Sequence, residues 1–596
     1  MGVDAFSTLV DEGGARAPAA AGLRRGFLND EEPVHVPESA AALAERVRAD
    51  LAECERLRAV KDDEAAPFDS RYEERRVLQR LLKALEQYGA GDAECAETAR
   101  TPLGVVCSLL GNNFVDTEEA GAGSAPLGRA IEMLGSGPAE LLHRVDALNH
   151  MGMLCSEREQ PKQALAHLSE AKALYERASA PGASPLAPPD AACALPAAER
   201  LERLHTLTLF YLAQVHAHLG DALQSAIHAH ATLRRQLHSA AAEFEPFEWC
   251  KNAMQLATYY ATVGAYDIAE HCLHAADRVL GAIDLDACRD AAGVLTDKYL
   301  ELRAGVHIAW GELLRAVLRA GRQGGARAHT PDAPSDAGGA PIRLSLDEER
   351  LTFRAALADL PPPSRECADC ASLAGFDEAR RVYRRALVRV LQAKAHYQLD
   401  GYVSDHYVCA NLEAQLLGAL VLYETDARRV LAMHRRRAAV LQPVLDAINP
   451  KAYHAIGRQM AFDLGTIYGD ILDVRQLMLR DQPAERARAK LQPAVDATTR
   501  ALYRFLDFFR DAQGEMPERV DAENEEVFLT AHFNIARAHG KLDDRESLAA
   551  SLRAYEFIRA YADKHDVVCM RDELKMAREM AELLPTKVGK TKPRPS

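Results

Sequence analysis

Apolar side chains recur every three or four residues along most of this 596-residue chain. This period matches one face of an α-helix, whereas no segment keeps the strict alternation of a half-buried strand. Outside the repeats described below, the pattern predicts helices at 72–88, 295–321, 376–400, 406–447, 451–478, 484–511 and 566–584. The hydrophobic pattern therefore predicts an all-α fold.

Internal repetition is the most informative feature of this pattern. A tetratricopeptide repeat is a helix pair of about 34 residues, with small side chains at positions 8, 20 and 27, where the two helices approach closely. The stretch NAMQLATYYATVGAYDIAEHCLHAADRVLG places Ala257, Ala269 and Ala276 at these positions, with Gly264 in the turn. This stretch therefore fits a complete repeat.

Two earlier stretches keep the same register. LFYLAQVHAHLGDALQSAIHAHATL places Leu212 and Ser225 at positions 7 and 20, with Gly220 in the turn. LNHMGMLCSEREQPKQALAHLSEAKALY places Gly152 and Ala164 at positions 8 and 20, and AHFNIARAHGKLDDRESLAASLRAYEF repeats the theme less cleanly. Repeats in register predict a tetratricopeptide-like α-solenoid, in which antiparallel helix pairs stack into a right-handed superhelix.

Segments rich in proline, glycine and alanine divide the chain. They offer too little apolar surface to offset the entropy of ordering the chain. We expect a disordered tail at 1–35, a loop at 178–196, a flexible insertion at 322–375 and a C-terminal tail at 587–596. The remaining segments then form two subdomains, a tetratricopeptide-like one at 36–321 and a helical-repeat one at 376–586.

The net charge of −15 changes the picture of possible partners. An acidic chain repels phosphate backbones and anionic lipids, so nucleic acid and membrane surfaces are poor partners and a basic protein surface is a better one. No stretch is apolar enough to span a bilayer, the N-terminus lacks the features of a signal peptide, and twelve cysteines are too few for a disulfide scaffold. A cytoplasmic monomer is expected.

Motifs for catalysis, metal binding or cofactor binding are missing. The sequence has no phosphate-binding loop, H-E-x-x-H or G-x-S-x-G motif. Cys367 and Cys370 form a C-x-x-C pair without a second pair at zinc spacing, and His228 and His230 lie on different sides of a predicted helix. We therefore expect no enzymatic activity, no metal and no cofactor.

The basic run at 433–437, MHRRR, resembles a nucleic-acid patch at first sight. It falls within a predicted long helix whose opposite face is apolar, and Glu424 and Asp426 upstream can pair with Arg428 and Arg429. A solvated or ion-paired helix face is the favoured interpretation.

The first helix of a tetratricopeptide pair lines the concave groove through positions 2, 5, 6, 9 and 12. Aromatic, methionine and amide side chains at such positions are typical of an adaptable protein-binding surface. The groove positions named from the three repeats are Asn149, Met153, Phe210, Tyr211, Gln214, Lys251, Met254, Gln255 and Thr258.

Several of these stretches resemble the kinesin-binding protein family. The similarity covers roughly 105–285 and 376–587, and it includes GNNFVDTEEAGAG, LFYLAQVHAHLGDALQSAIHAHATLRRQLH, FEWCKNAMQLATYY and LLPTK. The block at 397–454 is the most specific part, because DGYVSDH, YETD, MHRRR and INP have no role in ordinary tetratricopeptide repeats.

The resemblance implies a cytoskeleton-associated protein that grips kinesin motor domains and prevents their attachment to microtubules. The family uses the concave face of its N-terminal half to hold the motor helix that would otherwise meet tubulin. By motif, Tyr211, Gln214 and Gln236 match contact positions of the family, and Gln255 stands where the family has a smaller hydroxyl residue. These four residues are the predicted partner-binding site.

Two other functions compete with this interpretation. A co-chaperone adaptor would hold a peptide carboxylate with Lys, Arg and Asn at successive groove positions, but here Lys251 is the lone basic residue among those named. An enzyme on a helical scaffold would need a metal or phosphate constellation. The sequence supplies neither feature.

Overall fold

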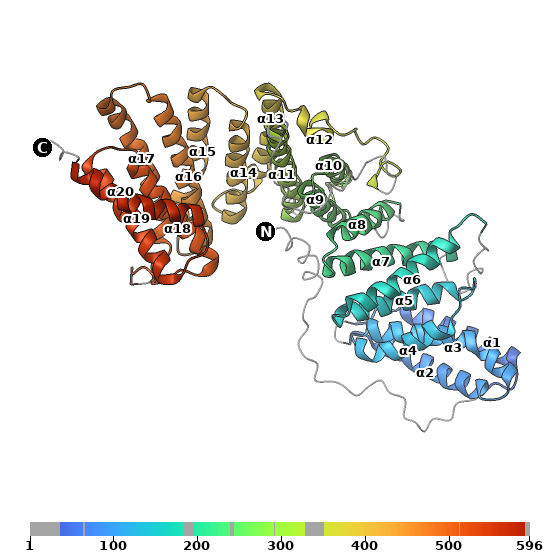
Figure 1. Cartoon of the computed structure of the whole chain (residues 1–596). Helices are drawn as coiled ribbons and strands as arrows, with labels where there is room; N and C mark the ends of the chain where they lie inside the picture. The colour runs from blue at the N-terminus through green and yellow to red at the C-terminus, as the bar shows by residue number, and fades with distance from the viewer. Residues whose placement is uncertain are drawn as a thin grey trace. The chain divides into compact units, whose positions relative to one another are not determined.

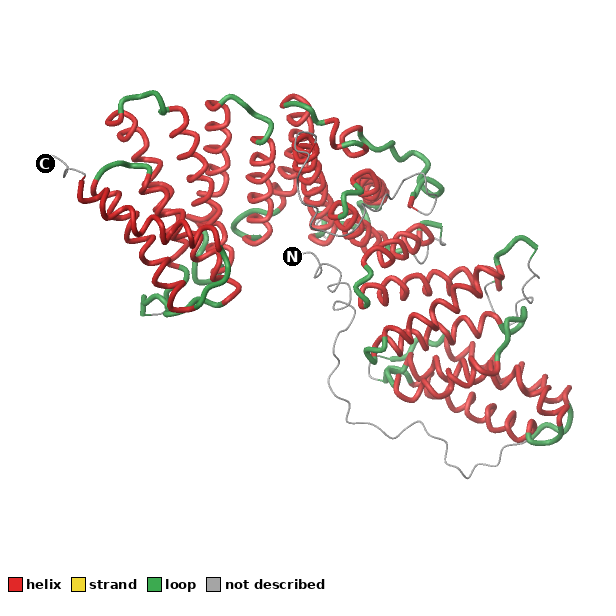
Figure 2. Tube along the Cα trace, in the orientation of Figure 1, coloured by secondary structure: helices red, strands yellow, loops and turns green. Residues whose placement is uncertain are grey.

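The computed structural model describes residues 36–63, 66–182, 196–238, 244–290, 293–327, 351–511 and 513–590. Figures 1 and 2 show these residues as a succession of α-helices. No β-strand forms among them, apart from an isolated β-bridge between Arg289 and Leu295. The all-α prediction is confirmed, and the expected tail at 1–35 lies outside the described residues, as do 183–195 and 328–350 of the expected loop and insertion.

The helices group into two compact units, with a boundary between Glu245 and Pro246. The first unit contains α1 (Ala40–Arg58), α2 (Asp69–Gly89), α3 (Ala93–Asp116), α4 (Ala120–Met133), α5 (Leu141–Glu157), α6 (Pro161–Ala178), α7 (Ala197–His218) and α8 (Ala222–Gln236), together with residues 351–359. This grouping divides the chain after α8, whereas the sequence suggested a division at 322–375. The expected subdomains remain a prediction.

The second unit begins at α9 (Pro246–Thr262) and α10 (Tyr266–Ala282). It continues with α11 (Asp297–Arg327), α12 (Arg365–Ala368), a 3₁₀ turn η4 (Cys370–Ser372), α13 (Phe376–His396), α14 (Val403–Val421), α15 (Ala427–Ala447), α16 (His454–Met478), α17 (Ala484–Asp507), α18 (Ala522–Gly540), α19 (Arg545–His565) and α20 (Arg571–Lys590). The last helix therefore extends four residues into the stretch expected as a tail.

Each of the three predicted repeats forms a helix hairpin: α5 with α6, α7 with α8, and α9 with α10. Gly220 and Gly264 occupy the turns with φ of 76° and 81°, a left-handed conformation that disfavours side chains with a β-carbon. Ala164, Ser225 and Ala269, which share position 20, are all buried between the paired helices. The tetratricopeptide-like packing is thus confirmed at the positions that define it.

Gly152 shows why the repeat needs a small residue at position 8. A β-carbon built on Gly152 of α5 would lie 2.6 Å from Cγ of Leu168 on α6, well inside van der Waals contact. Leu168 itself is completely buried and has little room to move.

Replacing Gly152 by valine is expected to destabilise the first unit by about 2 kcal/mol, because overpacking a filled core forces side chains and backbone to shift. Thermal unfolding followed by far-ultraviolet circular dichroism measures the loss. Gly128→Ala on α4 is the control, since a β-carbon there meets only Cε of Met151 at 4.0 Å. Equal destabilisation by both variants would contradict the close-packing explanation.

A buried arginine joins α2 to the C-terminal end of α3. Arg75, 1% exposed, donates hydrogen bonds to Oδ1 of Asn113 (2.9 Å), Oε1 of Glu119 (2.8 Å) and Oγ1 of Thr117. Its guanidinium also lies 4.1 Å from the centre of the Phe114 ring. Four residues of the GNNFVDTEE stretch therefore form a pocket for one cation.

The predicted helix at 406–447 is wrong, because the structure breaks it into α14 and α15. Asp426 caps α15 by accepting a hydrogen bond from the Arg428 N–H (2.8 Å), and Glu424 accepts from the N–H groups of Thr425 and Asp426. These acceptors satisfy backbone donors at the start of a new helix, which makes a turn at YETD more stable than a continuous helix.

Residues 360–373, part of the expected insertion, pack onto α10 and α11 in the second unit. The Ser364 N–H donates to Oε2 of Glu270 on α10 (2.6 Å), and Arg385 of α13 donates to Oε1 of the same carboxylate (2.8 Å). Cys367 and Leu373 are buried by this arrangement. In the described part of the chain no helix has both the length and the apolarity to cross a bilayer.

Candidate protein-binding face

The first helices of successive pairs lie side by side in the first unit, in the order α3, α5, α7. Nδ2 of Asn112 on α3 donates to Oδ2 of Asp146 on α5 (2.7 Å). Asn149 of α5 donates to the Leu204 carbonyl of α7 (3.0 Å) and accepts from the Thr208 hydroxyl (2.8 Å). These bonds join the three helices into one layer, and its exposed side is called the α3–α5–α7 face below.

Asn149 does not line this face, contrary to the prediction from the repeat positions. Its side chain is completely buried between α5 and α7. The two first helices pack directly against each other, so position 5 of this repeat faces the next helix instead of solvent. The amide therefore has a structural role.

Phe210, Tyr211 and Gln214 lie together on α7, as the sequence predicted. Phe210 is 41% exposed, and its ring centre is 5.6 Å from that of Tyr211. The Tyr211 hydroxyl contacts Sδ of Met153 on α5 at 3.2 Å. Tyr211, Gln214 and Met153 are all half-buried. The result is a surface of aromatic, thioether and amide groups that is neither fully solvated nor enclosed.

Carboxylates surround this group. Burial raises the pKa of Tyr211, and the charges of Glu157, Asp146 and Asp116 raise it further. Desolvation also raises the pKa of Asp116, although 43% of its side chain is exposed. The α3–α5–α7 face thus carries three carboxylates whose charges act on the hydroxyl of Tyr211.

Asp146 and His150 form an ion pair on the same face, with Nδ1 of His150 3.2 Å from Oδ1 of Asp146. Burial alone would raise the pKa of Asp146, but the hydrogen bond and charge of His150 hold it below its ordinary value. Desolvation likewise opposes the charged form of His150, and its bonds to Asp146 outweigh this effect and raise its pKa.

The sequence reasoning missed these two residues, although its own numbering contains them. With Leu148 at position 4, Asp146 and His150 occupy positions 2 and 6, both groove positions. Asp116 and Glu157 fall outside the repeat positions, and the electrostatic contacts with Tyr211 reveal them. The repeat arithmetic alone was therefore enough to find one of the three carboxylates, Asp146, and its partner His150.

The other two predicted site residues lie elsewhere. Gln236 is half-buried and ends α8, a second helix of its pair. Gln255 belongs to α9 in the second unit, where its Oε1 atom is buried and lacks a hydrogen-bond partner among the described residues. The structure brings Tyr211 and Gln214 together, but it does not place Gln255 with them. Lys251, one turn before Gln255, pairs with Glu248 at 3.0 Å.

The histidines singled out in the sequence have packing roles. His230 stacks on Phe353 with ring centres 4.3 Å apart, and His228 stacks on His216 at 5.4 Å. Burial lowers the pKa of His228 to about 4, which keeps the ring neutral. No group of three metal-binding side chains with suitable geometry occurs in the ranges that the structure describes.

The basic run on α15 forms the predicted ion pairs in part. Arg437 contacts Oδ2 of Asp470 on α16 at 3.1 Å, and its Nε donates to the Ala414 carbonyl of α14. Arg429 contacts Oε2 of Glu424 at 3.0 Å. Arg428 contacts Asp426 through its backbone N–H, as described above.

Comparisons with known proteins extend these observations. Residues 247–591 match the family model described as "KIF-1 binding protein C terminal". KIF-binding protein of Homo sapiens is 30% identical to the chain, covering 92% of it and 97% of the human protein. KIF-binding protein of Bos taurus is 29% identical, with 89% and 94% covered. 

A solved structure described as a cryo-EM map of KIFBP shares the fold. Its TM-score is 0.57 at 24% sequence identity, over 92% of this chain and 98% of the other. The similarity in sequence extends over both units, and the family model covers more than half of the residues. The chain therefore belongs to the KIF-binding protein family.

Proposed function

We propose that the α3–α5–α7 face binds kinesin motor domains and keeps them from attaching to microtubules. The proposal is supported by the names of the relatives, which are KIF-binding proteins over nearly the whole chain length. The observation that carries it is the group of Phe210, Tyr211, Gln214 and Met153 on an open layer of first helices. Binding of this kind requires no chemical step, and it places the protein in the cytoplasm with the cytoskeleton.

Electrostatics supports the choice of partner surface. Tubulin is acidic, so the microtubule-binding side of a motor domain is basic. Asp116, Asp146 and Glu157 give the α3–α5–α7 face the opposite sign, and the net charge of −15 extends that attraction over a longer range. Phe210 and Tyr211 then supply desolvated contact area for a helix laid in the groove.

Tyr211→Ala combined with Gln214→Ala is expected to weaken motor-domain binding about tenfold or more, since each truncation of a central interface residue costs about 1 kcal/mol or more. Both side chains are half-buried at the surface, so unfolding should change little. The measurement is the Kd for a purified motor domain by biolayer interferometry, with circular dichroism to confirm the fold.

A matched control changes two exposed residues of the second helix in the preceding pair, Lys162→Ala with Gln163→Ala on α6. This double variant should bind motor domains with the wild-type Kd. Wild-type affinity in the Tyr211 and Gln214 variant, or an equal loss in the α6 control, would remove the α3–α5–α7 face from consideration.

A further inference from the structure

Charge is strongly segregated between alternate helices of the second unit. Helices α13, α15 and α17 carry six, five and five basic residues against two, one and three acidic ones, a net charge of +10. The intervening α14, α16 and α18 together carry three basic and eight acidic residues. A layer this basic is unexpected in a chain whose net charge is −15.

Contacts near their ends link helices α13, α15 and α17. The guanidinium of Arg429 on α15 is 5.6 Å from the ring centre of Phe376 on α13. Arg504 of α17 donates to Oδ1 of Asp446 (2.7 Å) and to the Leu445 carbonyl (2.8 Å), both at the end of α15. The three linked helices are called the α13–α15–α17 layer below.

Ion pairs neutralise only part of this layer. Glu424, Asp470 and Asp446 pair with Arg429, Arg437 and Arg504. Several exposed arginines form no ion pair within the described part of the chain, among them one on each helix: Arg384, Arg436 and Arg500. Burial raises the pKa of Tyr383 on α13 and of Tyr468 on α16, and the charges of Arg436 and Arg500 oppose this rise.

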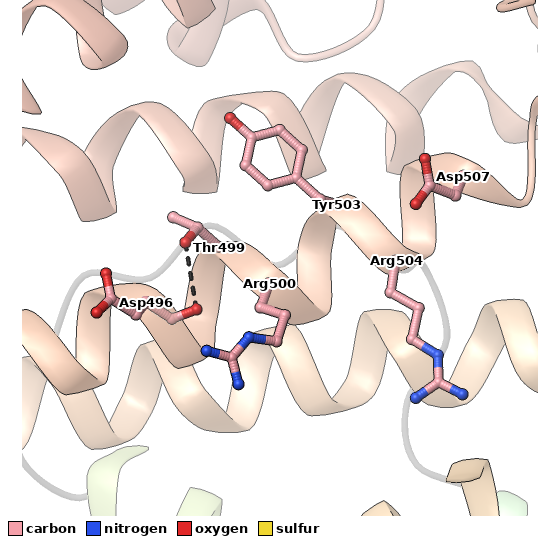
Figure 3. A pocket seen from close by; sticks show the side chains of 6 residues that line it. All are labelled: Asp496, Thr499, Arg500, Tyr503, Arg504 and Asp507. Carbon is pink, nitrogen blue, oxygen red and sulfur yellow. Dashed lines mark hydrogen bonds between the residues drawn. The ribbon is translucent and has the colours of Figure 1, made fainter.

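Apolar side chains are also exposed on two of these helices. Val388 and Leu391 of α13 are 57% and 46% exposed, and Tyr503 of α17 is 49% exposed. Figure 3 shows a shallow recess along α17, where Arg500 and Arg504 extend to the same side of the helix and Asp496 and Asp507 lie at its two ends. Arginine and tyrosine at an exposed recess are the residue types that contribute most to protein–protein binding.

We propose that the α13–α15–α17 layer is a second docking surface, which binds a carboxylate-rich polypeptide segment. Arginine guanidinium groups pair with carboxylates through two parallel hydrogen bonds, and the three free arginines can each take one. The exposed valine, leucine and tyrosine side chains suit the apolar residues of such a segment.

A polypeptide fits this layer better than a nucleic acid or an anionic membrane. Asp496 and Asp507 lie at the two ends of the recess on α17, and they would repel a continuous row of phosphates. A peptide can space its carboxylates to match separate arginines. The site is distinct from the proposed motor-binding face, which belongs to the other unit.

The test uses the full chain and a fluorescent poly-L-glutamate peptide, with fluorescence anisotropy at low and high salt. Arg384→Glu, Arg436→Glu and Arg500→Glu in one variant should weaken peptide binding at least about tenfold, since three exposed ion pairs are each worth a fraction of this. A control variant carries the same charge change on α19 and α20, with Arg553→Glu, Arg559→Glu and Arg571→Glu. Its affinity should fall by less than about threefold, through the long-range change in charge.

Failure of the peptide to bind the wild-type chain would overturn the proposal, and so would equal losses of affinity in both triple variants. The proposal would also be wrong if a duplex DNA oligonucleotide or phosphatidylserine vesicles bound more tightly than the peptide and this binding depended on Arg384, Arg436 and Arg500. Motor-domain binding is measured in parallel. Wild-type motor binding by the Arg384, Arg436 and Arg500 variant supports two separate sites, and a parallel loss would show that the layer belongs to the motor site. Loss of motor binding in the Tyr211 and Gln214 variant bears only on the first proposal.

Discussion

Replacing Arg75 by leucine is expected to destabilise the first unit by about 3 to 5 kcal/mol, which is the usual cost of removing one partner from a buried charged pair. Arg75 is 1% exposed and donates to Asn113, Thr117 and Glu119. Leucine fills part of the space but offers no donor, so the oxygens of Asn113 and Thr117 lose this donor while they stay shielded from water.

Neighbouring groups cannot replace the lost cation. Glu74, which is completely buried beside Arg75, already accepts from Arg58 (2.6 Å) and Arg71 (3.2 Å), so those two arginines are committed elsewhere. Repair of the network would need a movement of α3 relative to α2. We therefore expect the unfolding transition of the first unit to shift to a lower temperature.

The distribution of tryptophan allows the two units to be followed separately. Trp249 and Trp310 are the two tryptophans of the chain, and both lie in the second unit. Far-ultraviolet circular dichroism reports on all helices, whereas tryptophan fluorescence reports on the second unit alone. Arg75→Leu should shift part of the circular dichroism transition and leave the fluorescence transition in place.

Arg76→Leu is the matched control, because Arg76 is the next residue of α2 and is exposed. Leucine and arginine have similar helix propensities, so this variant should unfold like the wild type. If Arg75→Leu and Arg76→Leu unfold alike, the Arg75 network contributes nothing beyond helix formation. A shift in tryptophan fluorescence would instead show that the two units unfold together.

The hydrophobic pattern predicted the helix pairs because their determinants are local. Small residues such as Ala164 and Gly152 mark close approaches within a single repeat, at a spacing that the sequence displays directly. Networks between distant segments leave no such signal. Arg75 meets Asn113 and Glu119 across 38 and 44 residues, and nothing in the composition of α2 indicates this contact.

Local polar groups explain where the pattern failed. The turn at YETD is short, and the apolar period continues on both sides of it, so a single long helix was the natural interpretation. Glu424 and Asp426 end that helix by bonding to backbone N–H groups. The prediction for Asn149 failed for a different reason. A polar residue at a groove position is expected to be exposed, but α7 covers Asn149.

The candidate site was predicted in the same uneven way. Tyr211 and Gln214 lie on the face that the repeat positions assign to them, because α7 follows the repeat closely. The assignment of Gln236 and Gln255 to the site depends on the family resemblance. Gln255 lies in the second unit, whereas the other three residues lie in the first. The repeat numbering identifies Asp146 and His150 as groove residues. Asp116 and Glu157 are brought near Tyr211 only by the packing of α3 against α5 and of α5 against α7, which the numbering does not show.

Glu270→Ala is expected to open the segment around Cys367 without unfolding the second unit. Glu270 is completely buried, and its carboxylate accepts from the Ser364 N–H and from Arg385. Loss of this acceptor leaves a backbone donor of the 364–372 segment unpaired, and breaking such a buried charged contact costs about 3 kcal/mol or more. The short α12 and η4 are otherwise held by the Arg385–Glu366 ion pair and by local hydrogen bonds within the segment.

Reaction of the Cys367 thiol measures this opening. The thiol is 3% exposed, and burial raises its pKa far above the ordinary value, with a smaller contribution from the charge of Glu270. Because the thiolate is the reactive form, Cys367 in the wild type should react very slowly with iodoacetamide at pH 8. In Glu270→Ala the segment opens more often and the thiol loses a repelling carboxylate, so labelling should accelerate roughly a hundredfold.

Cys272 provides an internal control within the same helix as Glu270. It is completely buried in α10, and burial raises the pKa of its thiol. Mass spectrometry of the labelled chain should find Cys272 protected in both proteins, because α10 itself stays folded. Equal acceleration at Cys272 and Cys367 would mean that the whole unit had unfolded, whereas unchanged labelling of Cys367 would show that Glu270 does not hold the segment. Glu270→Gln keeps an acceptor for Ser364 but not the charge for Arg385, so its labelling rate should fall between the two.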